Sequence, residues 1–256
     1  MPRNSKAVAK TNENERATRS NKKAERYKDR LLALQTELAK LQKHIYESKS
    51  RLIAIVEGGE LSGKNKTIRS LSERLDTSIC SVVWQKERAS NGKWFLAQFA
   101  SKAPRKGEIA IFDRGWYGAL NDEYERRIHQ IPLFEQTLIE EGFIILKFFL
   151  KVGKEELNAR IEKQKSDPFE RLWLNEAALK KYRQYDEYAK AQEETLSRTH
   201  TPYAPWFIVG ADDKKEARLG VLATMLTAID YKGGDQKLLR ACEKTIAQSY
   251  APKVKF

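Results

Sequence analysis

The sequence is poor in the residues that build disulfide-rich domains and zinc sites. Its 256 residues include only two cysteines, Cys80 and Cys242, and three histidines that lie far apart, His44, His129 and His200. Two cysteines cannot cross-link a chain of this size, and no Cys/His pair has zinc-ligand spacing. These absences argue against a structural zinc site and against a histidine-based triad. The low cysteine content suggests a reducing compartment, for which we expect the cytoplasm.

Long apolar segments are also missing. The longest, from Phe143 to Leu150, is interrupted by Lys147 and is far shorter than the roughly 20 residues of a membrane-spanning helix. The N-terminal segment MPRNSKAVAK has no apolar core of the kind that secretory signals carry. We therefore expect neither a membrane segment nor a secretory signal.

Basic residues outnumber acidic ones. The chain has 48 Lys and Arg against 35 Asp and Glu, a formal net charge of +13. Such a surface attracts polyanions, which include nucleic acids, anionic lipids and phosphate-rich small molecules, although the charge also favours solubility alone. No recognised nucleic-acid motif is present, so a nucleic-acid partner ranks last among these.

Two N-terminal segments differ in character. Residues 1–22 have almost no large apolar side chain and several basic ones, which predicts a mobile basic tail. Residues 23–49 form a predicted helix that opens a single domain extending to residue 256. Its apolar residues follow a heptad-like spacing: Tyr27, Leu31, Leu34, Leu38, Leu41 and Ile45. Three heptads are marginal for a coiled coil, so we expect this face to pack on its own domain.

Five short apolar segments alternate with helical patterns along the rest of the chain. They predict strands at residues 51–56, 79–84, 109–112, 143–150 and 206–209, and the last two helices are expected at 214–229 and 236–248. Short, continuously apolar strands separated by helices are typical of a parallel sheet covered on both faces. We predict an α/β fold, a P-loop NTPase-like three-layer α/β/α sandwich with about five parallel strands. The charged segment 154–198 is expected to be an inserted helical lid.

A glycine-containing loop follows the first predicted strand. It fits the pattern G-x-x-x-x-G-K, in which backbone N–H groups wrap a phosphate at a helix N-terminus and the lysine, here Lys64, adds a positive charge. An ordinary glycine-rich turn can have the same letters, but the position between strand and helix favours the phosphate loop. The predicted phosphate-binding residues are Gly58, Gly59, Ser62, Gly63, Lys64, Asn65, Lys66 and Thr67.

The third predicted strand ends in a carboxylate, Asp113, as a Walker B strand does. Ligands of open α/β sheets gather at the carboxyl ends of strands, so Asp113 is expected to face the loop and hold Mg²⁺, directly or through water. Arg114 would add a planar cation beside it. The alternative for Asp113 is a capping residue of the next helix. Loop and strand together favour a phosphotransferase.

Four segments resemble, in order and spacing, the polyphosphate kinase 2 family: VEGGELSGKNKTI, GEIAIFDRGWYGAL, DPFERLWL and RTHTPYAPWFIVGADDKKEAR. The resemblance extends over residues 27–228. Members of this family are similar to thymidylate-kinase-like P-loop folds and use inorganic polyphosphate as phosphoryl donor to nucleotides, with Mg²⁺.

The resemblance implies roles for particular residues. Lys64 and its loop hold phosphates, Asp113 is the magnesium-linked aspartate, and Arg114 binds phosphate. Arg160 and Arg171 lie in the lid and close on the donor or the nucleotide. Glu60 stands where the family usually has an aspartate that shares in metal binding, so the implied metal residues are Asp113 and Glu60.

Some positions depart from the family pattern. Gly59 replaces a residue that is often basic, and Asn65 and Lys66 replace a Gly-Gly pair. In the lid, Gln164 and Glu170 stand at positions that are usually basic. These departures bear on catalytic rate and on substrate preference.

Three further residues are candidates for the acceptor nucleotide. Lys86 and Arg88 follow the second predicted strand, where a nucleotide phosphate would fit, although a solvated charged loop explains them equally well. Tyr117 is a candidate for stacking on a base, whereas we expect its neighbour Trp116 to pack in the core.

The leading prediction is a Mg²⁺-dependent phosphotransferase, with Mn²⁺ as an alternative metal. It would move a phosphoryl group between inorganic polyphosphate and a nucleoside mono- or diphosphate. Two alternatives stay open, an ATP-dependent nucleotide kinase of the same fold and a polyphosphate-binding domain with weakened catalysis. We expect a cytoplasmic homo-oligomer without a membrane partner.

Overall fold

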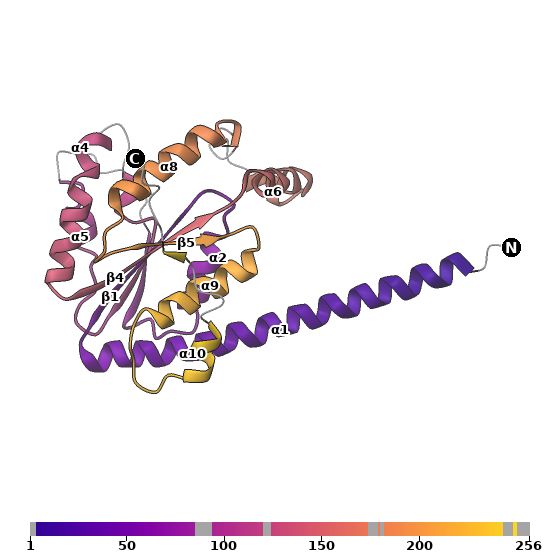
Figure 1. Ribbon diagram of the computed structural model, residues 1–256, viewed down its shortest axis with the longest axis horizontal. Coiled ribbons are helices and arrows are strands. Elements are labelled where there is room, and N and C mark those ends of the chain that lie inside the picture. The colour runs from indigo at the N-terminus through magenta and orange to yellow at the C-terminus, as the bar shows by residue number, and fades with distance from the viewer. Residues whose placement is uncertain are drawn as a thin grey trace.

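A six-stranded sheet forms the centre of the molecule (Figure 1). The computed structural model describes residues 4–84, 94–119, 124–173, 179, 182–242 and 248–249. The strands are β1 Arg51–Gly58, β2 Cys80–Trp84, β3 Ile109–Asp113, β4 Phe143–Lys151, β5 Trp206–Gly210 and β6 Gln248–Ser249. Each of the five predicted strands is therefore confirmed.

The sheet has the order β2-β3-β1-β4-β5-β6. Its first five strands run parallel, as predicted, and β6 pairs antiparallel with β5. The predicted helix at 236–248 is confirmed over α10 (Gln236–Cys242) and wrong at its end, because Gln248 lies in β6. A two-residue strand is too short to produce a periodic pattern, so sequence periodicity does not predict it.

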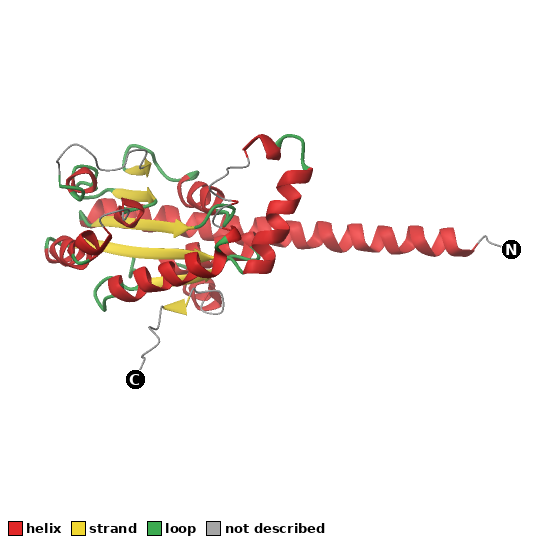
Figure 2. Cartoon of the chain, turned by 90° about the horizontal axis from the view of Figure 1, so that it is seen from above, coloured by secondary structure: helices red, strands yellow, loops and turns green. Residues whose placement is uncertain are grey.

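Helices cover both faces of the sheet (Figure 2). Alternate residues of β1 point into two separate cores, which explains its unbroken apolar sequence. Leu52, Ala54 and Val56 belong to one core, together with residues of α1 (Asn4–Ser48), α2 (Lys64–Ser72) and α9 (Lys214–Thr227). Ile53 and Ile55 belong to the other core. That second core also contains residues of α3 (Ala97–Ala100), α4 (Tyr124–Ile128), α5 (Gln130–Glu140) and α8 (Tyr185–Thr199).

The N-terminal helix differs from its prediction at one end. Leu34, Leu38, Leu41 and Ile45 are buried in the first core, so the expected packing of this stripe on its own domain is confirmed. The helix, however, begins at Asn4 and not near residue 23, and its N-terminal half projects from the domain (Figures 1 and 2). Residues 4–22 contain no Gly or Pro, so nothing breaks the helix even though the apolar stripe is absent.

The predicted lid region begins directly after β4. It contains α6 (Lys154–Ser166), the 3₁₀ turn η2 (Glu170–Trp173) and α8. A second 3₁₀ turn, η1 (Trp116–Ala119), follows β3 and lies in the second core through Trp116 and Tyr117. Within the described ranges, no helix has both the length and the apolar character needed to cross a bilayer.

Candidate active site

The loop between β1 and α2 has an unusually tight backbone. Gly58 and Gly63 have φ angles of 153° and 90°, and Leu61 has a φ of 62°. A Cβ atom at Gly58 would lie 2.9 Å from Ser62 Oγ and 3.0 Å from Leu150 Cβ, so only glycine fits there. Leu61 holds a left-handed conformation that costs a non-glycine residue free energy. The loop is thus bent to place its backbone at the N-terminus of α2.

This loop forms one wall of a pocket of about 460 Å³, which we call the polar pocket. The pocket is lined by Gly59, Glu60, Leu61, Ser62, Gly63, Lys64, Asn65, Lys66, Trp84, Asp113, Arg114, Lys214 and Arg218. Five of these side chains are cationic and two are carboxylates. An excess of positive charge beside a helix N-terminus is suited to a polyanion.

Lys64 and Asp113 form a hydrogen-bonded ion pair at the base of the polar pocket. The register of the sheet pairs Asp113 with Val56 of β1, so the end of β3 reaches the loop as predicted. Both side chains are over 90% buried. Burial, and then repulsion by Arg114, lower the pKa of Lys64 to about 8. An anionic ligand would offset that repulsion.

Ser62 carries a buried hydroxyl that lacks a hydrogen-bond partner among the described residues. A buried hydroxyl without a partner costs about 1–3 kcal/mol, which a ligand oxygen in the polar pocket would recover. Thr67, in contrast, is buried in α2 and its hydroxyl donates to the Gly63 carbonyl at 3.2 Å. Thr67 is therefore outside the polar pocket, unlike its predicted neighbours Asn65 and Lys66.

Arg114 follows β3 with a φ of 60°, the left-handed region. Its guanidinium donates to Glu60 at 2.8 Å. Backbone strain in a charged residue beside a pocket is a feature of functional sites. Arg114 lines the polar pocket and also a second pocket of about 340 Å³.

We call this second pocket the aromatic pocket. It is lined by Glu57, Gly58, Arg114, Tyr117, Tyr124, Phe149, Tyr188, Ala191, Gln192, Thr195, Leu196 and Trp206. The predicted residues Gly58 and Tyr117 are thus part of this pocket and not of the polar one. Aromatic rings beside a few polar groups are suited to a flat, hydrogen-bonding ligand such as a nucleobase.

Arg160 does not line either pocket. It is buried in α6, and its guanidinium donates to the carbonyls of Leu61, Ala211 and Asp212 at 2.6–2.8 Å. It also donates to Glu156 at 2.6 Å. The predicted lid arginine therefore connects the β1–α2 loop to the segment that follows β5. The bond from Arg160 to the Leu61 carbonyl holds the strained loop in place.

The other candidates lie apart from the pockets. Arg171 is exposed on η2 and lines neither pocket. Gln164 donates to the Glu170 carbonyl at 3.0 Å, a contact within the lid. Lys86 and Arg88 lie outside the described residues. Trp116 is 1% exposed, so its predicted role in the core is confirmed.

Two cations of the polar pocket were missed by sequence reasoning. Lys214 and Arg218 come from the first turns of α9, next to the loop. The side-chain carbons of Lys214 lie against Gly63. Asp213 caps α9 by accepting from the N–H groups of Lys215 and Glu216. A signal existed in the i, i+4 spacing of the two cations directly after a strand of the parallel sheet.

The carboxylates of the polar pocket fit magnesium delivered together with phosphate. Among the described residues, no cluster of three or more His, Cys, Asp or Glu is arranged to hold a metal. Mg²⁺ is commonly bound by one or two carboxylates plus substrate phosphates and water. Asp113 and Glu60 provide that donor set, each next to a cation that a phosphate would attract.

A parallel sheet, a tight loop at the start of α2, and a carboxylate at the end of the adjacent strand define the P-loop kinase class. Residues 21–237 match the family model described as Polyphosphate kinase 2, and the chain belongs to this family.

Individual relatives agree with this assignment. The chain is 33% identical over 220 residues to the GDP-polyphosphate phosphotransferase of Mycobacterium tuberculosis, covering 80% of this chain and 74% of that protein. It is 33% identical over 219 residues to the ADP-polyphosphate phosphotransferase of Pseudomonas aeruginosa, covering 81% and 72%. The crystal structure of polyphosphate kinase 2 from Arthrobacter aurescens TC1 superposes with a TM-score of 0.72 at 25% identity. That match covers 84% of each chain.

Proposed function

We propose that this protein transfers a phosphoryl group between inorganic polyphosphate and a nucleoside mono- or diphosphate. Family membership and the names of its relatives support the reaction type. The observation that carries the proposal is the position of Arg114, which lines both the polar and the aromatic pocket. A phosphoryl group that passes from one ligand to the other would do so beside this guanidinium.

The polar pocket takes the polyphosphate chain. Lys64 and the loop N–H groups would bind the reacting end, and the unpaired hydroxyl of Ser62 would donate to a phosphate oxygen. Lys66, Lys214 and Arg218 extend the positive charge across the pocket and would contact further phosphates. Each of these cations increases the affinity for a chain of linked anions, because every added contact is made by the same bound molecule.

The aromatic pocket takes the nucleoside of the acceptor. The ring of Tyr117 forms part of its wall, while the hydroxyl of Tyr117 donates away from the pocket to Glu135. Stacking on such rings holds a base with little dependence on its identity. The acceptor phosphate would then point toward Arg114.

The chemistry requires no covalent enzyme intermediate, because the acceptor phosphate is itself the nucleophile. Lys64 exchanges the Asp113 carboxylate for a phosphate oxygen, and Lys64 and Arg114 then stabilise the negative charge of an in-line displacement. Asp113 and Glu60 would hold Mg²⁺, or Mn²⁺ in its place, and the metal would neutralise neighbouring phosphates. Arg160 acts indirectly by holding the loop at Leu61.

A domain with weakened catalysis is the second candidate. Gln164 and Glu170, which replace basic residues of the family pattern, carry no positive charge, and the Gln164 side chain donates to the Glu170 backbone carbonyl within the lid. This candidate would bind polyphosphate without transferring phosphate. The third, an ATP-dependent kinase, would transfer phosphate from ATP alone.

One assay separates the three candidates. Purified protein is incubated with Mg²⁺ or Mn²⁺, polyphosphate or ATP as donor, and AMP, ADP, GMP or GDP in separate reactions. We expect product from polyphosphate and a fall of about 100- to 1,000-fold in Lys64→Ala, the loss typical of a charge-stabilising group. Lys43→Ala, a change at an exposed lysine of α1, is the control and should keep full activity.

The possible results each have a defined meaning. Equal turnover in wild type and Lys64→Ala contradicts the assigned site. Product from ATP but none from polyphosphate supports the ATP-dependent kinase, and polyphosphate binding without product supports the weakened domain.

A cytoplasmic location and self-association are further parts of this proposal. The low cysteine content supports the location, and the family resemblance supports self-association.

A further inference from the structure

A fully buried ion pair lies behind the aromatic pocket. Lys147 interrupts the apolar sequence of β4, and its ammonium contacts Glu135 of α5 at 2.7 Å. Both side chains are 0% exposed. Neither residue lines the polar or the aromatic pocket.

Burial makes both charges of this pair unfavourable. Burial lowers the pKa of Lys147 and raises the pKa of Glu135, so the surroundings oppose both charges. Buried ion pairs can usually be replaced by apolar residues of similar volume without loss of stability. Their best attested benefit is to fix one arrangement of the groups bonded to them.

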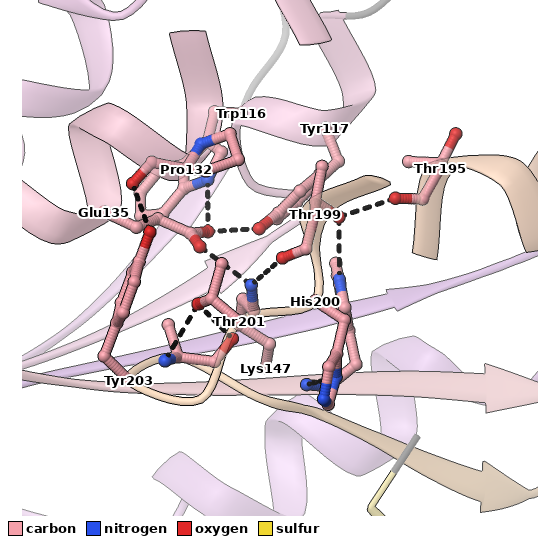
Figure 3. Close-up of polar contacts among 12 residues, drawn as sticks. Trp116, Tyr117, Pro132, Glu135, Lys147, Thr195, Thr199, His200, Thr201 and Tyr203 are labelled. Carbon is pink, nitrogen blue, oxygen red and sulfur yellow. Dashed lines mark hydrogen bonds and ion pairs between the residues drawn. The ribbon is translucent and has the colours of Figure 1, made fainter. Parts of the chain in front are cut away.

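On one side, the pair holds the turn η1 (Figure 3). Glu135 accepts hydrogen bonds from Trp116 Nε1 at 2.9 Å and from the hydroxyl of Tyr117. Tyr117 is a wall residue of the aromatic pocket, three positions after Arg114. The carboxylate therefore sets where the ring of Tyr117 lies.

On the other side, the pair holds the end of α8 (Figure 3). Lys147 donates to the carbonyl of Thr199 at 2.8 Å, in the last turn of that helix, where a cation also interacts favourably with the helix dipole. The hydroxyl of Thr199 accepts from Trp206 Nε1 at 2.9 Å. The same helix contributes Tyr188, Gln192 and Thr195 to the aromatic pocket.

The two sides meet in the aromatic pocket. The rings of Tyr117 and Trp206 lie 4.6 Å apart, and the ammonium of Lys147 lies 5.1 Å from the centre of the Trp206 ring. One lysine and one carboxylate thus connect the turn after β3, the returning arm of the lid and the strand β5. A change in the pair would alter the spacing of opposite pocket walls.

We propose that Glu135 and Lys147 are positioning residues for the acceptor nucleoside, because they fix the distance between η1 and α8 across the aromatic pocket. The inference rests on the proposed function. Apart from Arg114, the polar pocket is lined by residues that do not line the aromatic pocket, so the polyphosphate side should respond little to a change in this pair.

The test compares Lys147→Met and the double variant Lys147→Met/Glu135→Gln with wild type. Methionine keeps a long, unbranched side chain without charge. We expect the KM for the acceptor nucleotide to rise about tenfold, the scale of coupling through one hydrogen-bond network. The KM for polyphosphate, and kcat at saturating nucleotide, should change less than about threefold. Equilibrium binding of AMP, ADP, GMP and GDP gives the same comparison without turnover.

The double variant separates positioning from simple loss of fold. Lys147→Met alone leaves the Glu135 carboxylate buried without its cation, which lowers the melting temperature. Removing both charges should restore much of that temperature while the nucleotide KM stays raised. Tyr203→Phe is the control, since it removes a 3.1 Å hydrogen bond to the Pro132 carbonyl next to this network without touching the pair. It should leave both KM values unchanged.

The contrary results can be told apart. A folded double variant with wild-type nucleotide affinity overturns the positioning role, as does an equal rise in both KM values. Wild-type protein that binds none of AMP, ADP, GMP and GDP contradicts the proposed function itself and, with it, this inference.

Discussion

Lys64 combines a positive charge with a buried position that opposes it. Its pKa is lowered to about 8, from the ordinary 10.5 of lysine, first by burial and then by Arg114. A lysine with a lowered pKa loses its proton at a lower pH than usual. In the free protein, Lys64 is therefore charged near neutrality and increasingly neutral above pH 8.

This titration predicts a pH dependence of polyphosphate binding. Affinity should fall between about pH 7 and about pH 9, because the neutral form of Lys64 no longer attracts a phosphate. The measurement is equilibrium binding of polyphosphate across this range at constant ionic strength.

The matched control for this prediction is Lys64→Arg. A guanidinium does not lose its proton in this range, so the variant should lack the step near pH 8. The same step in both proteins would assign it to another group or to polyphosphate itself.

Among the elements, α9 has a role that exceeds its part in the core. Its buried side packs against α1 and the sheet, while Lys214 and Arg218 extend from its first turns into the polar pocket. Among the described residues, one short helix start thus supplies two of the five cations that line the polar pocket.

Lys214→Ala should raise the KM for polyphosphate about tenfold, equivalent to about 1.4 kcal/mol. The nucleotide KM should change little, because Lys214 does not line the aromatic pocket. Steady-state kinetics with each substrate varied in turn measures the difference. Lys215→Ala is the matched control, since the adjacent lysine is exposed and outside the polar pocket. Equal effects of the two changes would point to general surface charge.

The elements of the sheet could be predicted because their sequences carry a strong physical signal. β1, β3 and β4 are buried on both faces and therefore read as apolar runs, which in the interior of β4 are interrupted by Lys147. The start of α1 could not be placed in this way, since residues 4–22 have no apolar stripe. Helix continuation there depends on the absence of breaking residues, which is a weaker signal.

The candidate site was predictable only in part. The loop and Asp113 are local patterns, and the parallel order of the strands brings them together. The contacts of Arg160, whose lid position the family resemblance implies, could not be predicted, because the sequence does not reveal that its guanidinium donates to three backbone carbonyls. Lys214 and the Glu135–Lys147 pair depend on contacts between segments far apart in sequence. No local pattern encodes such contacts.

On the scale of the whole molecule, α1 has two halves with different consequences for stability. The part that carries Leu34, Leu38, Leu41 and Ile45 completes the first core. Burying a side chain of this kind contributes about 1.5–3 kcal/mol, so the four together rival the total stability of a typical domain, about 5–15 kcal/mol.

Two truncations test this division. Removal of residues 1–22 should leave the melting temperature within a few degrees of wild type, because the N-terminal half of α1 projects from the domain (Figure 2). Removal of residues 1–49 should abolish cooperative unfolding. Thermal unfolding followed by circular dichroism measures both. A stable, folded protein without residues 1–49 would contradict the assigned role of the stripe.

The projecting half of α1 also affects how the size of this protein is measured in solution. A helix of 45 residues is about 68 Å long at 1.5 Å per residue, whereas a compact chain of 256 residues has a radius of gyration of about 18 Å. Friction increases with elongation, so a monomer of 29.6 kDa would elute from a gel-filtration column at the volume of a heavier globular standard. The apparent mass derived from the elution volume would therefore be too high and could be taken for that of a dimer. Light scattering and sedimentation equilibrium respond to mass and not to shape, so they are better suited to counting subunits.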